Sequence, residues 1–188
     1  MAPAARSQPI FYYDLGSPPC YLAAERISSA LPVLPEWEPV LAERLGAVDY
    51  EPNRALIERL AAEQGIQPLR WPRSWPPQTR VAMLAASYAK KVGRGVAFSL
   101  ASFRQTFAGG RELGDEDTVL LAAAACEMHP TAILKGIALR STADALELAV
   151  ERARVAGVGA LPAIQVGAEL YDGACAVERA AAALMVRG

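Results

Sequence analysis

A serine and a cysteine lie three residues apart in the segment DLGSPPCYLAAERI, which spans residues 14 to 27. An apolar run ends just before Ser17, and helical spacing begins after Pro18 and Pro19, so both side chains are expected in the first turn of a helix. A thiol at Cys20 could act as a nucleophile there. The pattern leaves three interpretations open: a dithiol site that lacks one sulfur, a site that binds the thiol of another molecule, and a helix cap.

Ser17 stands where a helix N-cap is expected, and Pro18 fills the first helical position, where a missing amide hydrogen costs little. The motif makes sense as a cap alone. A helix N-terminus also stabilises an anion such as a thiolate, by roughly 0.3 to 1 kcal/mol, through its free amides and dipole. Ser17 is not expected to be a nucleophile, because the single histidine, His129, precedes Pro130 and is interpreted as a surface or capping residue rather than a base.

The three cysteines, Cys20, Cys126 and Cys175, are an odd set in a chain with no recognisable export signal, so a disulfide framework is not expected. Cys20 has two interpretations. It is either a reactive single thiol or a small buried side chain, since free cysteine is among the most buried residue types. Cys126 lies on an apolar helix and is interpreted as buried. One histidine and scattered cysteines predict no metal site.

The composition excludes several classes of partner. The 188 residues carry a formal net charge of -1 without a basic cluster, so nucleic acid is not an expected partner. The longest apolar runs, such as Val119 to Cys126, are too short to span a membrane, and Met1 to Gln8 is a short polar leader without the apolar stretch of a signal peptide. We therefore expect a cytoplasmic protein.

Beta structure is predicted at both ends of the chain. Gln8 to Leu15 is a predicted strand, a helix then runs to about Ala30, and Glu36 to Leu41 forms a second strand, which this crossover makes parallel to the first. Near the C-terminus, Ala160 to Val166 and Glu169 to Tyr171 form a predicted hairpin, followed by a helix over Ala174 to Val186.

The middle of the chain is predicted to be almost wholly helical. A helix over 53–64 is followed by the proline-rich loop Gln67 to Pro77. Acidic residues mark one later helix start, Asp115 to Asp117, and Ser141 with Asp144 resembles a capping box at another. The remaining helices are expected at 78–91, 96–108, 116–127, 130–138 and 143–155. The order βαβ, helical block, ββα predicts an α/β thioredoxin fold with an inserted helical domain.

Three segments then resemble a known family in the right order: FYYDLGSPPCYLAAERI, NRALIERL and GVGALPAIQVGAELYDG. They are similar to the DsbA-like thioredoxin superfamily, and within it to 2-hydroxychromene-2-carboxylate isomerase and the kappa-class glutathione transferases. The resemblance covers nearly the whole chain. It implies a thioredoxin-like domain made of residues 8–50 and 157–188, and an all-helical domain made of residues 51–156.

The resemblance also assigns roles to single residues. Ser17 replaces the nucleophilic cysteine of dithiol enzymes and donates a hydrogen bond to the sulfur of a bound thiol, lowering its pKa. Leu161 and Pro162 form a cis-proline segment opposite this turn, where the Leu161 backbone pairs with a peptide-like thiol. Asn53 contributes a lesser polar contact.

One position departs from the family pattern. Where the family has an acidic residue for the γ-glutamyl end of glutathione, this chain has Cys175, and Asp172 lies three residues too early. Three consequences stay open: a different thiol cofactor, an altered site that uses Asp172, or loss of the cofactor. Cys175 could also face Cys20 as an unusual thiol pair.

The two tryptophans of the proline-rich loop and the aspartate before Ser17 each have two interpretations. Trp71 and Trp75 either cover a hydrophobic substrate or pack between the two lobes. Asp14 either accepts backbone hydrogen bonds at the end of the first strand or takes part in chemistry.

The leading functional hypothesis is an enzyme that uses glutathione or another low-molecular-weight thiol on an electrophilic aromatic or unsaturated carbonyl substrate. By resemblance, the reaction is an isomerisation through reversible thiol addition or a related transfer, and a homodimer is possible. A first alternative is a DsbA-like thiol-disulfide oxidoreductase that acts through Cys20. A second is a non-catalytic ligand-binding protein with a degenerate thiol site.

Overall fold

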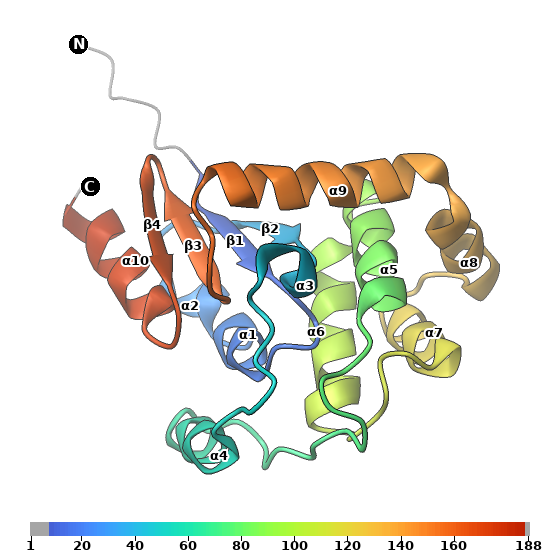
Figure 1. The fold of residues 1–188 in the computed structure, drawn as a ribbon, viewed down its shortest axis with the longest axis horizontal. Helices are drawn as coiled ribbons and strands as arrows, with labels where there is room; N and C mark the ends of the chain where they lie inside the picture. The colour runs from blue at the N-terminus through green and yellow to red at the C-terminus, as the bar shows by residue number, and fades with distance from the viewer. Residues whose placement is uncertain (1–7, 187–188) are drawn as a thin grey trace.

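The computed structural model describes residues 8–186, which contain a four-stranded sheet with the order β2-β1-β3-β4 (Figure 1). Residues 1–7 of the predicted polar leader lie outside the described residues. Strand β1 pairs in parallel with β2, while β3 pairs antiparallel with both β1 and β4. The thioredoxin arrangement predicted from the order of elements is therefore confirmed. The strands are β1 (Ile10–Tyr13), β2 (Glu36–Pro39), β3 (Ala163–Val166) and β4 (Glu169–Asp172).

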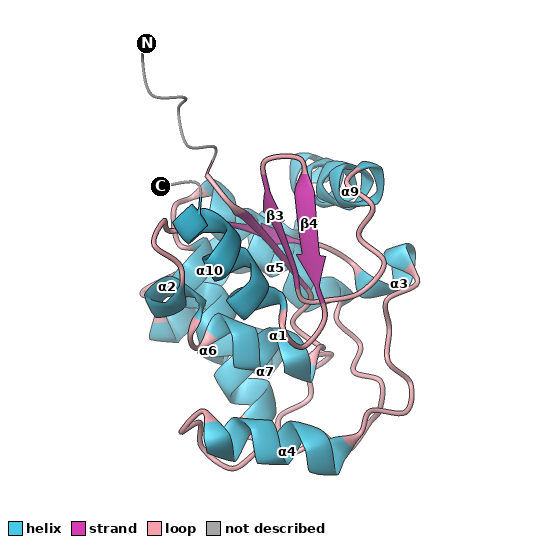
Figure 2. Cartoon of the chain, turned by 90° about the vertical axis from the view of Figure 1, so that its left-hand side faces the viewer, coloured by secondary structure: helices cyan, strands magenta, loops and turns pink. Residues whose placement is uncertain are grey.

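The predicted helix after β1 is interrupted. Helix α1 (Pro18–Ala24) and helix α2 (Ile27–Ala30) are separated at Arg26, whose amide bonds to the carbonyl of Ala23, three residues back rather than four. Helix α10 (Ala176–Val186) packs on β3 and β4 and contacts α2. Figure 2 shows α10 and α1 on one side of the sheet and α9 on the other.

Helices follow one another between β2 and β3, close to the predicted ranges. Helix α3 was not predicted, since four residues give no periodic pattern. No helix within residues 8–186 is both long and apolar enough to cross a membrane. The helices are α3 (Ala42–Leu45), α4 (Arg54–Glu63), α5 (Arg80–Lys91), α6 (Gly95–Phe107), α7 (Glu116–Ala125), α8 (Pro130–Ala138) and α9 (Arg140–Val155).

Two predicted helix starts have opposite outcomes. His129 is the N-cap of α8, and its Nδ1 accepts a hydrogen bond from the Thr131 amide at 3.2 Å, which confirms the capping interpretation. The predicted capping box of Ser141 and Asp144 is wrong. Helix α9 begins earlier, at Arg140, so Ser141 lies inside its first turn, and the Asp144 carboxylate lies 3.8 Å from the guanidinium of Arg140.

One continuous core joins the sheet to the helices of the middle segment. Strand alternation points Phe11 and Tyr13 to the same face, where their rings stack at 5.3 Å and meet Trp37 edge-on. The Tyr13 hydroxyl forms a buried hydrogen bond of 2.6 Å with Ser99 of α6. These contacts fix the end of β1 from which the Ser17 turn starts.

Candidate functional site

The turn after β1 holds Ser17 in a defined geometry. The Ser17 amide donates to the Asp14 carbonyl at 3.1 Å, and the Ser17 backbone is extended at φ −97° and ψ 113°. Its Oγ accepts a hydrogen bond from the Cys20 amide at 3.4 Å. The cap interpretation is therefore confirmed. Because capping uses a lone pair of the oxygen, the hydroxyl hydrogen remains able to donate to a ligand.

The expected free amides at this helix end are absent. Pro18 and Pro19 have no amide hydrogen, and the Cys20 amide donates to Ser17. The hydroxyl of Ser17 is consequently the donor that the first turn of α1 can offer to an anion. This corrects the sequence-based expectation that backbone amides would share that task.

Cys20 has no exposed surface. Burial raises the pKa of its thiol to about 12, although hydrogen bonds with the Ser17 side chain and the Asp14 backbone act in the opposite direction. A thiol with this pKa is protonated at neutral pH. The structure therefore places Cys20 as a small buried side chain, and it disfavours a reactive thiol at this position. Cys126 is also buried, as expected.

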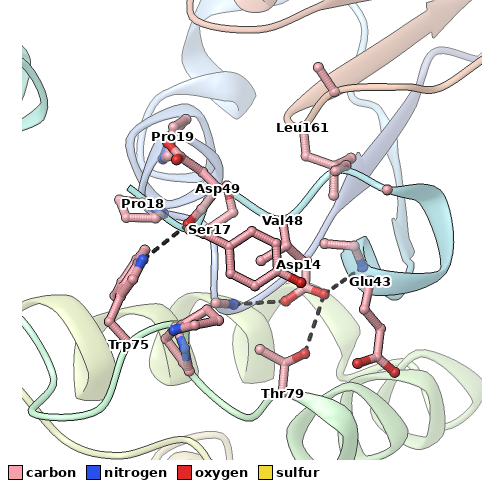
Figure 3. A pocket seen from close by; sticks show the side chains of 18 of the residues that line it. Asp14, Ser17, Pro18, Pro19, Glu43, Val48, Asp49, Trp75, Thr79 and Leu161 are labelled. Carbon is pink, nitrogen blue, oxygen red and sulfur yellow. Dashed lines mark hydrogen bonds between the residues drawn. The ribbon is translucent and has the colours of Figure 1, made fainter. Parts of the chain in front are cut away.

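A cavity of about 820 Å³ opens in front of Ser17. Figure 3 shows Ser17, Asp14, Trp75 and Leu161 around it, from three separate segments of the chain. The Leu161–Pro162 peptide bond is cis, which confirms the expectation for this segment. The Leu161 amide makes no hydrogen bond with another group in residues 8–186. Ser17 and Leu161 thus bring a hydroxyl donor and a free amide to the same cavity.

Asp14 is a buried acidic residue that lines this cavity. Its side chain is 2% exposed, and its oxygens accept hydrogen bonds from the Gly16 amide at 2.8 Å, the Ala42 amide at 2.9 Å and the Thr79 hydroxyl at 3.3 Å (Figure 3). The backbone-acceptor interpretation is confirmed. Burial raises the pKa of Asp14 to about 6, because these hydrogen bonds oppose the loss of hydration only in part.

The proline-rich loop between α4 and α5 brings Trp75 to the main cavity, and a contact of its tryptophans with a substrate stays a prediction. Trp75 lines the cavity, and its Nε1 donates to the Asp49 carbonyl at 3.0 Å. Trp71 packs behind it, with the two ring centroids 5.3 Å apart. The Arg54 guanidinium lies 4.5 Å from the centre of the Trp71 ring, and the Glu58 carboxylate accepts from Trp71 Nε1 at 2.7 Å. Trp71 therefore packs against Trp75, and Trp75 forms part of the cavity wall.

A second cavity, of about 160 Å³, lies beside the first and shares Pro19 and Asp49 with it. Asn53 lines this second cavity and not the first, and its side-chain oxygen caps α4 by accepting from the Leu56 amide at 3.0 Å. Asn53 thus lines the neighbouring cavity and not the one in front of Ser17, and its contact with a bound thiol stays a prediction.

The two positions considered for the far end of a thiol do not line either cavity. Asp172 is half-buried at the end of β4, paired with Ala163, and Cys175 is exposed on the turn before α10. Cys20, by contrast, is wholly buried, and both sulfurs are free. The structure does not pair these two cysteines. It also gives no support to Asp172 as the altered acidic contact.

Six further polar residues line the main cavity without having been predicted as site residues: Glu43, Asp49, Tyr50, Gln78, Thr79 and Arg80. Glu43 lies on the unpredicted helix α3, and Thr79 is the N-cap residue of α5. The only available signal was the predicted start of a helix directly after the proline loop. No group of three or more histidine, cysteine, aspartate or glutamate side chains suited to a metal ion occurs in residues 8–186.

Comparisons with known proteins agree with this architecture. The family model described as the DSBA-like thioredoxin domain matches residues 10–185. A comparison with curated protein sequences finds no match.

Several solved structures share the fold. A 2-hydroxychromene-2-carboxylate isomerase has 17% identity and a TM-score of 0.81, over 95% of this chain and 94% of its own. A probable DsbA oxidoreductase from Streptomyces coelicolor has 17% identity and a TM-score of 0.78, over 96% of this chain and 89% of its own. The cytosolic disulfide reductase DsbM from Pseudomonas aeruginosa has 15% identity and a TM-score of 0.66, over 96% and 98%. At these identities the likeness shows the fold alone.

Proposed function

We propose, from the premise that the chain belongs to the DSBA-like thioredoxin domain family, that it is an enzyme that binds a low-molecular-weight thiol and uses it on an electrophilic substrate. Membership of the family supports an enzyme of the DsbA-like oxidoreductase and isomerase superfamily. Glutathione is the first thiol to test. The substrate class is an aromatic or unsaturated carbonyl compound, and the reaction is an isomerisation or a related transfer.

One observation carries the proposal: Ser17 lines the large cavity, while the neighbouring Cys20 is fully buried, which raises the pKa of its thiol to about 12. Serine at position 17 removes the two-cysteine route of disulfide exchange. Burial of Cys20 works against the one-cysteine route, because the thiolate is the nucleophile. What the turn still offers is a hydroxyl donor, and a charged acceptor such as a thiolate makes a hydrogen bond worth roughly 1.5 to 3 kcal/mol.

Ser17 and Leu161 have different roles in the proposed reaction. Ser17 donates to the cofactor sulfur and lowers its pKa, while the free Leu161 amide offers a backbone hydrogen bond to a peptide-like thiol. A thiol held there would supply a nucleophile for reversible addition to the electrophilic carbon, and it would be regenerated without net oxidation.

The cavity wall supports an aromatic substrate. Trp75, Tyr50 and Val48 line it together with the first two prolines of α1 and the last two prolines of the loop before α5. Flat aromatic compounds stack on such surfaces, and exclusion of water by them strengthens the hydrogen bonds at the sulfur. The proposal assigns the protein to the cytoplasm, where low-molecular-weight thiols are kept reduced.

Calorimetric titration of the reduced protein with reduced glutathione tests the proposal, with a Ser17→Ala variant in parallel. We expect micromolar to low-millimolar binding that weakens at least tenfold in the variant. Binding of aromatic carbonyl compounds without any thiol binding would instead favour a non-catalytic binding protein. An inert cavity in both titrations would contradict the proposal.

A further inference from the structure

The N-terminal end of helix α5 contacts the turn that carries Ser17. The Thr79 hydroxyl donates to Oδ2 of Asp14 at 3.3 Å (Figure 3). A Cβ atom at Gly16 would lie only 2.5 Å from the methyl carbon of Thr79. Because glycine has no side chain, the turn and Thr79 can lie in direct contact. Thr79 therefore touches the turn with both its hydroxyl and its methyl group.

A second contact lies one helical turn further along α5. The Met83 sulfur accepts a hydrogen bond from the buried Leu15 amide at 3.3 Å. The Met83 amide in turn donates to the Thr79 carbonyl at 2.8 Å, so the two residues are neighbours on one side of the helix. Together they contact residues 14, 15 and 16, which directly precede the candidate donor serine.

Thr79 is the N-cap residue of α5, yet its side chain makes no capping hydrogen bond. A threonine at this position normally accepts from an amide of the first turn, and replacing such a cap by alanine costs about 1 kcal/mol. The Thr79 hydroxyl is directed to Asp14 instead, and there it is the donor, because an ionised carboxylate can only accept. Helix α5 thus lacks a favourable local contact where it meets the site, which is typical of functional positions.

Asp14 links Thr79 to Ser17 through the backbone of the turn. Its Oδ1 accepts from the Gly16 amide at 2.8 Å, and its carbonyl accepts from the Ser17 amide at 3.1 Å. The Ala42 amide donates to the same carboxyl group at 2.9 Å, and of the three donors only Thr79 uses a side chain. Burial raises the pKa of Asp14, while these hydrogen bonds favour its ionised form, which accepts from all three.

We propose that Thr79 is a positioning residue for Ser17, which holds the Asp14 carboxyl group so that the turn presents the Ser17 hydroxyl to the sulfur of a bound thiol. Without the Thr79 hydroxyl, the carboxyl group loses one of its three donors and can turn away from the Gly16 amide. The Ser17 hydroxyl then spends less time in the donating orientation. This inference rests on the proposed function, and it assigns part of the geometry of the thiol site to the helical segment between β2 and β3.

The test is a double-mutant cycle on glutathione binding, measured by calorimetry at concentrations that saturate Ser17→Ala. Thr79→Val removes the hydroxyl but keeps a branched side chain of similar size against Gly16. It is made alone and together with Ser17→Ala. We expect Thr79→Val to weaken binding roughly three- to tenfold when Ser17 is present and less than about twofold in the Ser17→Ala background. A residue that only supports the fold would weaken binding by the same factor in both backgrounds.

Two further variants separate the hydroxyl from packing. Thr79→Ser keeps the hydroxyl and loses the methyl group, so it is expected to bind glutathione within about twofold of the unmodified protein. Thr106→Val is the matched control, because it removes another threonine hydroxyl, which donates to the Ser102 carbonyl at 3.0 Å and lines neither cavity. Its glutathione binding is expected to be unchanged. Urea unfolding of every variant establishes that it is folded.

The results separate the inference from the function on which it rests. If Thr79→Val binds glutathione like the unmodified protein while Ser17→Ala does not, the positioning role is overturned and the thiol site stands. Equal weakening in both backgrounds, or a Thr79→Ser variant that binds as weakly as Thr79→Val, likewise overturns it. If the unmodified protein binds no glutathione, the proposed function fails first, and the inference fails with it.

Discussion

The oxygen of the Ser17 side chain accepts a hydrogen bond from the Cys20 amide at 3.4 Å, so the two residues of the SPPC motif are joined by a helix cap. The prolines between them lack amide hydrogens. The turn therefore resembles an anion site in which the usual backbone donors are missing and one hydroxyl takes their place. Single substitutions can therefore separate the role of Ser17 from that of its neighbours.

Native alkylation should discriminate among the three cysteines. Cys175 is exposed, whereas Cys20 is buried with a pKa raised to about 12 by burial. The Cys20 thiol is therefore protonated at neutral pH. We expect iodoacetamide to label Cys175 alone in the folded protein, and Cys175→Ser to remove nearly all labelling, as read by mass spectrometry of the intact chain. Labelling of Cys20 in folded protein would restore the oxidoreductase alternative.

Asp14 should make the protein less stable as the pH rises. Its pKa is raised from 3.8 to about 6, so between these values the folded state binds more protons than the unfolded state. Stability is therefore lost as the pH rises from about 4 to about 6, by up to roughly 3 kcal/mol. Urea unfolding of the unmodified protein and of Asp14→Asn across this range measures the difference. Parallel curves for the two proteins would show that Asp14 does not titrate in this way.

Trp75 should affect the substrate more than the thiol. It lines the main cavity but does not line the second one. Trp75→Ala is expected to lower kcat/KM for an aromatic carbonyl substrate about tenfold, with thiol affinity changed less than twofold. Steady-state kinetics and thiol titration on the same preparation give both values. An equal loss of thiol affinity would mean that Trp75 contributes to binding of the thiol cofactor.

Gly136 should be needed for the packing of α8 on α5. A Cβ atom at this position would lie 2.4 Å from the Tyr88 ring, well inside contact distance. Gly136→Ala is expected to reduce the free energy of unfolding by about 1 to 3 kcal/mol. Gly159→Ala is the control, because no atom lies within 4 Å of its added Cβ, and a change below about 0.5 kcal/mol is expected. Denaturant unfolding that gives equal values for both variants would rule out the steric account.

Much of the fold was predictable because local signals and tertiary structure agree. The start of α8 follows from His129 and Pro130, and the parallel pairing of β1 with β2 follows from the handedness of the crossover. The boundary of α9 was mispredicted because Ser141 and Asp144 form a cap-like pattern inside a helix. The break at Arg26 was missed because a turn bonded to a residue three positions back has nearly the same side-chain spacing as a helix.

The candidate site was predictable only in part. Ser17 and Leu161 could be found because each belongs to a motif with its own local signature. Thr79 and Glu43 were missed because tertiary packing alone brings them beside Asp14. The prolines at 18 and 19 did contain a signal, since the absence of their amide hydrogens follows from the sequence itself.

The pKa of the bound thiol is the most direct test of the role of Ser17. It is measured by following the ultraviolet absorbance of the thiolate of bound glutathione against pH, in the unmodified protein and in Ser17→Ala. A hydrogen bond to the thiolate worth roughly 1.5 to 3 kcal/mol corresponds to about 1 to 2 pH units. We expect the pKa in the unmodified protein to lie that far below its value in the variant. Equal values in the two proteins would contradict the assignment of Ser17 as the donor to the cofactor sulfur.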